Sequence, residues 1–317
     1  LAVKEKLASA EKIAVMSELD VCDLLSKQYE LVFSESENIG LVKKENAQKL
    51  AELKNVTPAI SVEGLEENTD KRRGKGVHKQ ILKAFENLRS VGVPFGISVT
   101  ATNNNLDELL SDDFYKFYFD EQRVTYMWQF QFLPIGRGNE AFEAMVTPKD
   151  RLKLYRVWEK QLVDNKYCIA DFWNSGMLTS GCIAYGGNNG YIYIDWNGNI
   201  MPCVFVPFSV DNVYNLYKEN RTIEDALKSE FMSNGREWQN RYMAQQKKVK
   251  GNLLMPCSFR DHYDKFYNYV KTDNIKGEDS IAEEIIKSKE YYDRLTEYDK
   301  ELHELTDPIW TSEYLQE

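Results

Sequence analysis

This sequence of 317 residues has no CxxC pair and no long apolar run, and each absence excludes some classes of protein. Among the five cysteines no two form a CxxC pair, and an odd number in a chain of this length argues against a disulfide framework. No run of about 18 apolar residues, the length that spans a bilayer, is found. The first residues also lack the apolar core of a signal peptide. We therefore expect a cytoplasmic protein with reduced thiols and no membrane partner.

The charge of the chain is acidic, with a formal net value of -10. Phosphate groups would be repelled at long range, so we expect no nucleic-acid partner. The hydrophobic share of 43% is sufficient for a packed core. A chain of this length has room for one large α/β domain and a smaller appendage.

In the first 176 residues, apolar strand-like segments alternate with amphipathic helical segments. Thr147 is the expected N-cap of one such helix, with Pro148 as its first residue. This alternation predicts a parallel sheet covered by helices. About five strands are fewer than the eight of a full (β/α) barrel, so we expect an α/β fold with a partial barrel. Strands are predicted at residues 30–33, 57–62, 95–100, 126–133 and 167–172, and helices at 4–25, 42–53, 75–91, 107–119 and 148–163.

From residue 177 onward the pattern changes to that of a β-hairpin. Residues 191–195 alternate in polarity and are followed by Asn197-Gly198, a pair typical of a type I′ turn. The aromatic side chains of this segment are expected to pack on the hairpin. Two further helices are predicted, at residues 222–245 and 279–305. We expect a small cysteine-containing domain over residues 177–272 and a C-terminal helix over 273–317.

Three cysteines form the strongest candidate site. Cys182 precedes the predicted hairpin and Cys203 follows it, so both would lie at its feet and close together. Cys257 shares with Cys203 a preceding proline, which fixes φ and helps to set a ligand loop. Soft thiolates grouped in this way suit an iron–sulfur cluster or zinc. The alternative is three cysteines that simply pack in the core.

A fourth ligand does not stand out. His262 and Asp261 follow Cys257 closely and are the candidates, although His262 could equally be a surface residue. Cys168 lies in an apolar run and is predicted to be a core residue. Cys22 follows a helical face and is also predicted to be structural.

Several stretches, in order, resemble radical S-adenosylmethionine (radical SAM) proteins that carry a SPASM or twitch-like auxiliary-cluster domain. They cover residues 57–64 (TPAISVEG), 69–74 (TDKRRG, similar to a turn in the family), 93–100 (VPFGISVT), 132–138 (FLPIGRG) and 181–203. The resemblance implies a partial radical SAM barrel over residues 1–176, an auxiliary domain over 177–272 and a [4Fe–4S] auxiliary cluster on Cys182, Cys203 and Cys257.

The resemblance also implies where SAM would bind. The residues are Ser61 and Glu63 near the ribose, Ser98 and Thr100 at the same mouth, Pro134 and Gly136 beside the adenine, and Arg73 as the partner of a carboxylate. Simpler roles stay open: Ser61 could be a satisfied strand hydroxyl, and Glu63 and Arg73 could form a surface pair. Asp171, Trp173 and Asn174 follow a strand end, where they could face substrate or hold a helix end.

The sequence departs from the family in its first part. The CxxxCxxC segment that holds the catalytic [4Fe–4S] cluster in the family is absent, as is the Gly-Gly-Glu element, and residues 33–38 (FSESEN) replace the TNG element. We expect either a truncation of the first two strands or a diverged, non-catalytic relative. In both cases this chain alone should not cleave SAM, and a partner could cover its open barrel edge.

Three functions are weighed. The first is a radical SAM enzyme in its complete form, which cleaves SAM reductively and abstracts hydrogen from an unknown small-molecule or peptide substrate. The second is a non-catalytic metal-binding or peptide-binding module with a structural iron–sulfur or zinc site. The third is a barrel enzyme that uses acid–base groups near Glu63, Arg73 and Asp171. No catalytic residue is assigned.

Overall fold

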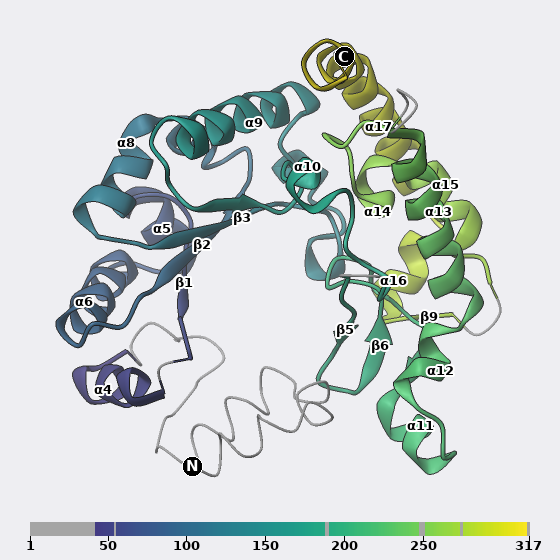
Figure 1. Ribbon diagram of the computed structural model, residues 1–317, viewed down its shortest axis with the longest axis horizontal. Helices are drawn as coiled ribbons and strands as arrows, with labels where there is room; N and C mark the ends of the chain where they lie inside the picture. Colours follow the sequence, from purple (N-terminus) through teal and green to yellow (C-terminus); the bar gives the residue numbers. More distant parts are fainter. Residues whose placement is uncertain (1–41, 54, 188–189, 247–250, 273–274, 316–317) are drawn as a thin grey trace. The chain divides into compact units, whose positions relative to one another are not determined.

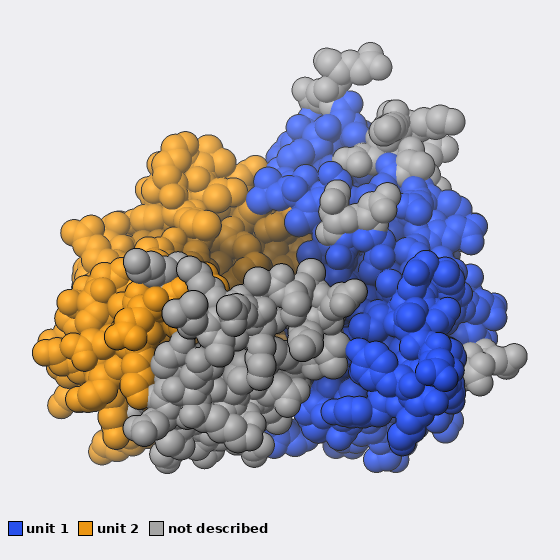
Figure 2. All heavy atoms as spheres, turned by 60° about the horizontal axis from the view of Figure 1, so that its bottom comes forward, with its two compact units in different colours: residues 1–21, 133–140, 176–317 blue, residues 22–132, 141–175 orange. Residues whose placement is uncertain are grey.

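The computed structural model describes residues 42–53, 55–187, 190–246, 251–272 and 275–315. These divide into two compact units, coloured in Figure 2. The sheet unit comprises described residues up to 132 and 141–175, and the cysteine unit comprises 133–140 and those from 176 onward. The elements expected at residues 4–25, 30–33 and 33–38, and Cys22, lie outside the described residues. No described helix has the length and apolar character needed to cross a membrane.

The sheet unit is built on four parallel strands in sequential order. The predicted α/β class is therefore confirmed, and Figure 1 shows helices along one side of the strands. Because strand residues point alternately to opposite faces, one face is buried and mostly apolar, with Gln129 and Gln131 of the third strand as polar exceptions, while the other carries small polar and aromatic side chains. The strands are β1 (Ala59–Val62), β2 (Gly96–Ala101), β3 (Tyr126–Gln131) and β4 (Ile169–Asp171).

Most of the predicted helices of this unit are found. Thr147 caps α9 as expected, since its Oγ1 accepts a hydrogen bond from the backbone N–H of Asp150 at 3.2 Å. Gly92 follows α6 with a φ of 72°, which suits a residue without a side chain. The helices are α4 (Lys44–Leu53), α5 (Glu66–Arg73), α6 (Val77–Ser90), α7 (Leu106–Leu109), α8 (Asp112–Tyr115), the π-helix η2 (Lys116–Glu121), the 3-10 turn η4 (Phe142–Ala144) and α9 (Pro148–Val163).

Two predictions for this unit were wrong in detail. The single helix expected at residues 107–119 is divided, because Ser111 is extended and its hydroxyl caps α8 by accepting from the N–H of Asp113. The segment at residues 69–74, expected as a turn, forms most of helix α5. This helix has acidic residues in its first turn and basic residues in its last, which suits the helix dipole.

The cysteine unit contains two small sheets and several helices. Strands β5, β6 and β8 form an antiparallel sheet, and β7 pairs with β9. Helices α13, α14, α15 and α17 pack around Phe259, Tyr263 and Phe266, which are fully buried. The elements are η3 (Gly136–Gly138), α10 (Gly176–Thr179), β5 (Tyr193–Ile194), β6 (Asn199–Met201), β7 (Phe208–Ser209), β8 (Asp211–Asn212), α11 (Val213–Lys218), α12 (Ile223–Leu227), α13 (Glu230–Gln246), α14 (Ser258–Asp261), α15 (Tyr263–Tyr269), β9 (Lys276–Gly277), α16 (Ser280–Ile285), α17 (Lys289–Ile309) and the π-helix η5 (Trp310–Tyr314).

The predicted hairpin is present, but its turn differs from the expected type. The N–H of Gly198 donates to the carbonyl of Asp195 at 3.0 Å, so Trp196 and Asn197 occupy the centre of a four-residue turn. Only Gly198 has a positive φ, at 83°, whereas a type I′ turn requires two such residues. The longer loop arises because the Asp195 carboxylate accepts hydrogen bonds from the N–H groups of Asn197 and Asn199.

The two long helices predicted for this unit are each interrupted. The stretch at residues 222–245 is divided into α12 and α13. The stretch at 279–305 is divided into α16 and α17, because Ser288 is extended and caps α17 through the N–H of Tyr291. Apolar periodicity continues across both breaks, so the local capping side chains decide where the helices stop.

Gly64, at the end of β1, is expected to be the least replaceable glycine of the sheet unit. Its φ is 146°, and a Cβ there would lie 2.0 Å from the Glu108 carboxylate. That carboxylate accepts a hydrogen bond from the N–H of Leu65 at 2.6 Å, so it cannot move freely. We expect Gly64→Ala to lower the free energy of unfolding by about 2 to 4 kcal/mol in urea titrations.

Gly76 provides the matched control for this substitution. Its φ is 83°, but no atom lies within 4 Å of an added Cβ. Gly76→Ala therefore measures backbone strain alone, and we expect a loss of about 1 kcal/mol. Equal losses in the two variants would contradict a specific conflict between residue 64 and Glu108.

Candidate functional site

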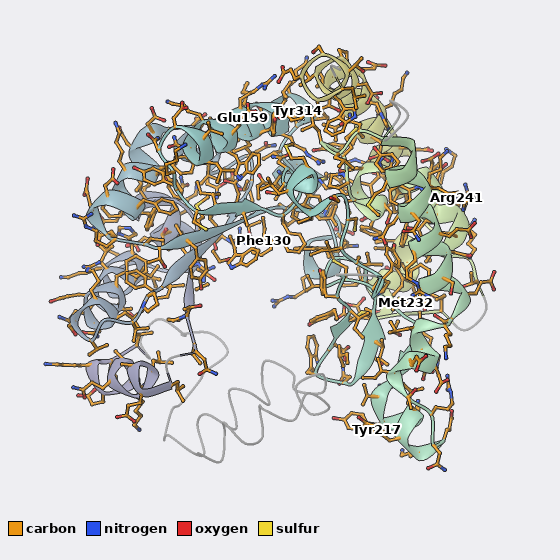
Figure 3. All side chains as sticks on the ribbon, in the orientation of Figure 1. Phe130, Glu159, Tyr217, Met232, Arg241 and Tyr314 are labelled. Carbon is orange, nitrogen blue, oxygen red and sulfur yellow. The ribbon has the colours of Figure 1, made fainter. Side chains whose placement is uncertain are left out.

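The less buried face of the parallel sheet brings three of the predicted SAM-site residues together. Ser61 and Ser98 are cross-strand partners, and Thr100 lies two residues further along β2 on the same face. On β3, Trp128 pairs with Ser98 and Phe130 pairs with Thr100. Figure 3 shows Phe130 on the side of the sheet away from the helices. This face therefore combines hydroxyl groups with aromatic surface, which suits a ligand with a polar ribose and a flat base.

Glu63 is held by two arginines at the end of β1. The Arg73 guanidinium donates from Nε and Nη2 to Oε1 at 3.0 and 2.6 Å, and Arg72 Nη1 lies 3.2 Å from Oε2. The Glu63 side chain is 6% exposed, so the pair is not the exposed surface pair considered above. The carboxylate partner of Arg73 is Glu63 itself, and Arg72 was not predicted. Both hydrogen bonds from Arg73 go to Oε1, and Glu63 Oε2 is buried with no hydrogen-bond partner among the described residues.

Pro134 and Gly136 lie in the segment Leu133–Glu140, which groups with the cysteine unit. Pro134 is buried, and Gly136 opens the turn η3 with a φ of 53°. Their expected position beside the adenine therefore stays a prediction.

Asp171, at the end of β4, is fully buried and binds its own strand–helix turn instead of facing a ligand. Its carboxylate accepts hydrogen bonds from Gln129 Nε2 at 2.5 Å and from the backbone N–H groups of Trp173 and Asn174. Arg151 Nε in turn donates to the Asn174 side chain at 3.2 Å. Trp173 and Asn174 are 1% and 2% exposed. Their role is to fix the backbone after β4.

The three candidate cysteines gather at one place in the cysteine unit. Cys203 is buried, and Cys182 and Cys257 are half-buried. Burial raises the pKa of Cys182 and of Cys203 to about 12, and raises the pKa of Cys257 as well. Each thiol further raises the pKa of one of the others, which requires the three to be near one another. Without a metal all three are protonated at neutral pH, so metal binding would release protons.

Hydrogen-bond donors surround these sulfur atoms. The Tyr191 hydroxyl lies 2.8 Å from Cys203 Sγ, and the N–H of Phe205 donates to the same sulfur at 3.5 Å. The N–H of Arg260 donates to Cys257 Sγ at 3.4 Å, where Cys257 caps helix α14. Such donors stabilise thiolate charge and are the surroundings expected of metal-bound sulfur. Tyr191 was predicted only as hairpin packing, and its proximity to sulfur could not be derived from the strand pattern.

The two candidates for a fourth ligand both have other partners. Asp261 is fully buried and accepts from the N–H of Cys257 at 3.1 Å. His262 Nε2 lies 2.9 Å from the Met255 carbonyl, and its ring packs against Trp238. Among the residues that the structure describes, no three Cys, His, Asp or Glu side chains are placed to hold a single metal ion. The metal assignment therefore stays a prediction.

Cys168 is exposed, which corrects the prediction of a core residue. Strand β4 begins only at Ile169, and Cys168 contributes its carbonyl to the sheet by accepting from the N–H of Met127 at 2.9 Å. The Cys168 thiol is therefore not packed in the core, although the apolar residues around it in the sequence predicted that it would be.

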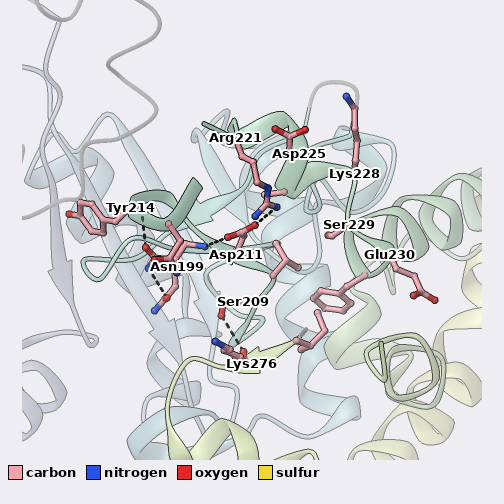
Figure 4. Close-up of a pocket in the computed structure, with 16 residues that line it drawn as sticks. Asn199, Ser209, Asp211, Tyr214, Arg221, Asp225, Lys228, Ser229, Glu230 and Lys276 are labelled. Carbon is pink, nitrogen blue, oxygen red and sulfur yellow. Dashed lines mark hydrogen bonds and ion pairs between the residues drawn. The ribbon is translucent and has the colours of Figure 1, made fainter. Parts of the chain in front are cut away.

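Two surface hollows lie in the cysteine unit. One, of about 470 Å³, is lined by Cys182 together with Arg236 and Gln239. The other, of about 860 Å³ and shown in Figure 4, is lined by polar residues that include Asp211 and Arg221. These two side chains form an ion pair at 2.6 Å. Of these two hollows, only the first is lined by one of the candidate metal-binding cysteines.

No protein-family model matches the chain. An AdoMet-dependent heme synthase of Methanosarcina barkeri is 24% identical over 181 residues, which cover 49% of this chain and 50% of that protein. The match thus spans about half the length of this curated relative. It confirms the resemblance found in the motifs: the chain is a relative of the radical SAM enzymes.

Solved structures give weaker likenesses. Native anSMEcpe with bound AdoMet and Kp18Cys peptide is 16% identical, with a TM-score of 0.49 and coverage of 86% of this chain and 73% of that one. Streptococcus suis SuiB bound to precursor peptide SuiA is 16% identical, with a TM-score of 0.41 and coverage of 68% and 50%.

His262 makes the stability of the cysteine unit depend on pH. Burial lowers the pKa of His262 to about 4, although Asp261 opposes this shift. The unfolded chain therefore binds the proton first as the pH falls from 6.5, and stability is lost down to about pH 4. Neighbouring His303 has the opposite effect, because its hydrogen bond with Asp307 raises its pKa.

We expect His262→Gln, which keeps a donor for the Met255 carbonyl, to flatten this acid loss. In urea titrations of the metal-free chain, the decrease in unfolding free energy from pH 6.5 to 4.5 should be smaller by about 2 kcal/mol than in the parent. An unchanged decrease would show that the His262 ring is not held neutral by its surroundings.

Proposed function

We propose that the chain forms part of a radical SAM enzyme and that Cys182, Cys203 and Cys257 hold an auxiliary iron–sulfur cluster. The observation that carries the proposal is the proximity of three thiols from distant parts of the sequence, each of which raises the pKa of another. Reductive SAM cleavage and hydrogen abstraction are proposed for the complete protein.

The donor set fits such a cluster. Three soft sulfur ligands, withdrawn from water and approached by N–H and O–H donors, suit an iron–sulfur cluster, whose fourth ligand is not assigned. A single tetrahedral zinc would need thiolates about 3.8 Å apart, as follows from a Zn–S distance near 2.3 Å. In an iron–sulfur cluster the cysteine ligands bind separate iron atoms and lie further apart than around a single ion. When bound, the cluster would supply one-electron transfer.

On the sheet unit, the hydroxyls of Ser61, Ser98 and Thr100 are proposed to face SAM. They share one face of the sheet with Trp128 and Phe130, against which a base can stack. The Glu63 carboxylate, paired with Arg72 and Arg73, is proposed as an acceptor for ribose hydroxyls. The substrate-binding side chains are not assigned.

We expect the anaerobically reconstituted chain to bind iron and inorganic sulfide in comparable amounts. Cys203→Ser and Cys257→Ser should each reduce both by more than about tenfold, since removing a ligand weakens metal affinity at least that much. Cys168→Ser, which changes an exposed cysteine, should retain both. Stoichiometric zinc without sulfide, or equal losses in all three variants, would contradict the cluster.

The reaction is tested in the longest natural form of the protein. Incubation with SAM and a strong reductant should yield 5′-deoxyadenosine, measured by liquid chromatography. A loaded protein that forms none would contradict radical SAM catalysis while leaving the auxiliary site intact.

A further inference from the structure

Tyr191 brings a hydroxyl into the cysteine cluster. Its oxygen lies 2.8 Å from Cys203 Sγ, and the residue is half-buried. Its backbone is fixed on both sides: the N–H donates to the Ile183 carbonyl at 2.9 Å, and the carbonyl accepts from the N–H of Gly186 at 3.0 Å. The ring is therefore attached to the chain that follows Cys182 while its hydroxyl meets Cys203.

The direction of this hydrogen bond follows from the ligand chemistry. A cysteine bound to iron is a thiolate and has no proton, so the phenol must be the donor. The backbone N–H groups of Phe205, at the longer distance of 3.5 Å, and of Val204 also donate to Cys203 Sγ, so the phenol is the side-chain donor beside two backbone donors.

We propose that Tyr191 is a positioning residue that sets the reduction potential of the cluster through its O–H···S bond to Cys203. The inference rests on the proposed function, since it requires a cluster on these cysteines. Hydrogen bonds to cluster sulfur offset negative charge, and the reduced state carries one more electron than the oxidised state. The bond therefore favours reduction and raises the potential.

The test compares two Tyr→Phe variants of the anaerobically reconstituted chain by redox titration followed with electron paramagnetic resonance. Tyr191→Phe removes the oxygen while keeping the ring, and should shift the midpoint potential to a more negative value with iron and sulfide content unchanged. Tyr263→Phe is the matched control: it lies in the same unit, is buried, and its hydroxyl has no hydrogen-bond partner among the described residues. Its potential should equal that of the parent.

The same titration separates the inference from the proposed function. A parent chain that takes up no iron and sulfide refutes both. A loaded parent whose potential is unchanged in Tyr191→Phe refutes the role of Tyr191 alone.

If Tyr191→Phe takes up no iron and sulfide, 3-fluorotyrosine is incorporated at position 191 instead. This residue keeps the shape of tyrosine and makes its hydroxyl a stronger hydrogen-bond donor. This substitution should move the potential in the positive direction. An unchanged or more negative potential would overturn the proposal.

Discussion

The meeting of three thiols from separate segments is the constraint on which the cysteine unit depends. Cys182 and Cys203 are brought together by the hairpin of β5 and β6, and Cys257 arrives on a loop that the C-terminal helix holds in place. Asn252, near the start of that loop, donates from Nδ2 to both Thr306 Oγ1 and Asp307 Oδ1 at 2.8 Å. Side-chain hydrogen bonds thus tie helix α17 to the start of the loop that leads to Cys257.

Two carboxylates at strand ends of the sheet unit show how similar positions acquire different roles. Asp171 is fully buried, and its carboxylate accepts hydrogen bonds from backbone N–H groups of the turn after β4. Glu63 is paired with two part-exposed arginines and lies at the end of the strand that carries Ser61. The opposite face is buried, and its polar side chains Gln129 and Gln131 are hydrogen-bonded to Asp171, whereas the face with hydroxyls and aromatic rings is less buried.

Much of this arrangement follows from local patterns in the sequence. Apolar periodicity and a Thr-Pro start predicted α9, and alternation around Asn197-Gly198 predicted the hairpin. What escaped prediction depends on single side chains or on distant contacts. Ser111 and Ser288 cap their own backbone and so divide helices whose apolar pattern continues. The Asp195 carboxylate lengthened the hairpin turn. The hydrogen bond between Tyr191 and Cys203 joins two segments of the chain, and no periodic pattern in the sequence predicts that these two side chains meet.

Diffraction at the iron absorption edge from crystals of the anaerobically loaded chain would test the central claim most directly. The account predicts anomalous density for more than one iron atom, bounded by the sulfur atoms of residues 182, 203 and 257, with the hydroxyl of residue 191 directed at one of them. Iron bound elsewhere, or a lone ion in place of a cluster, would contradict it.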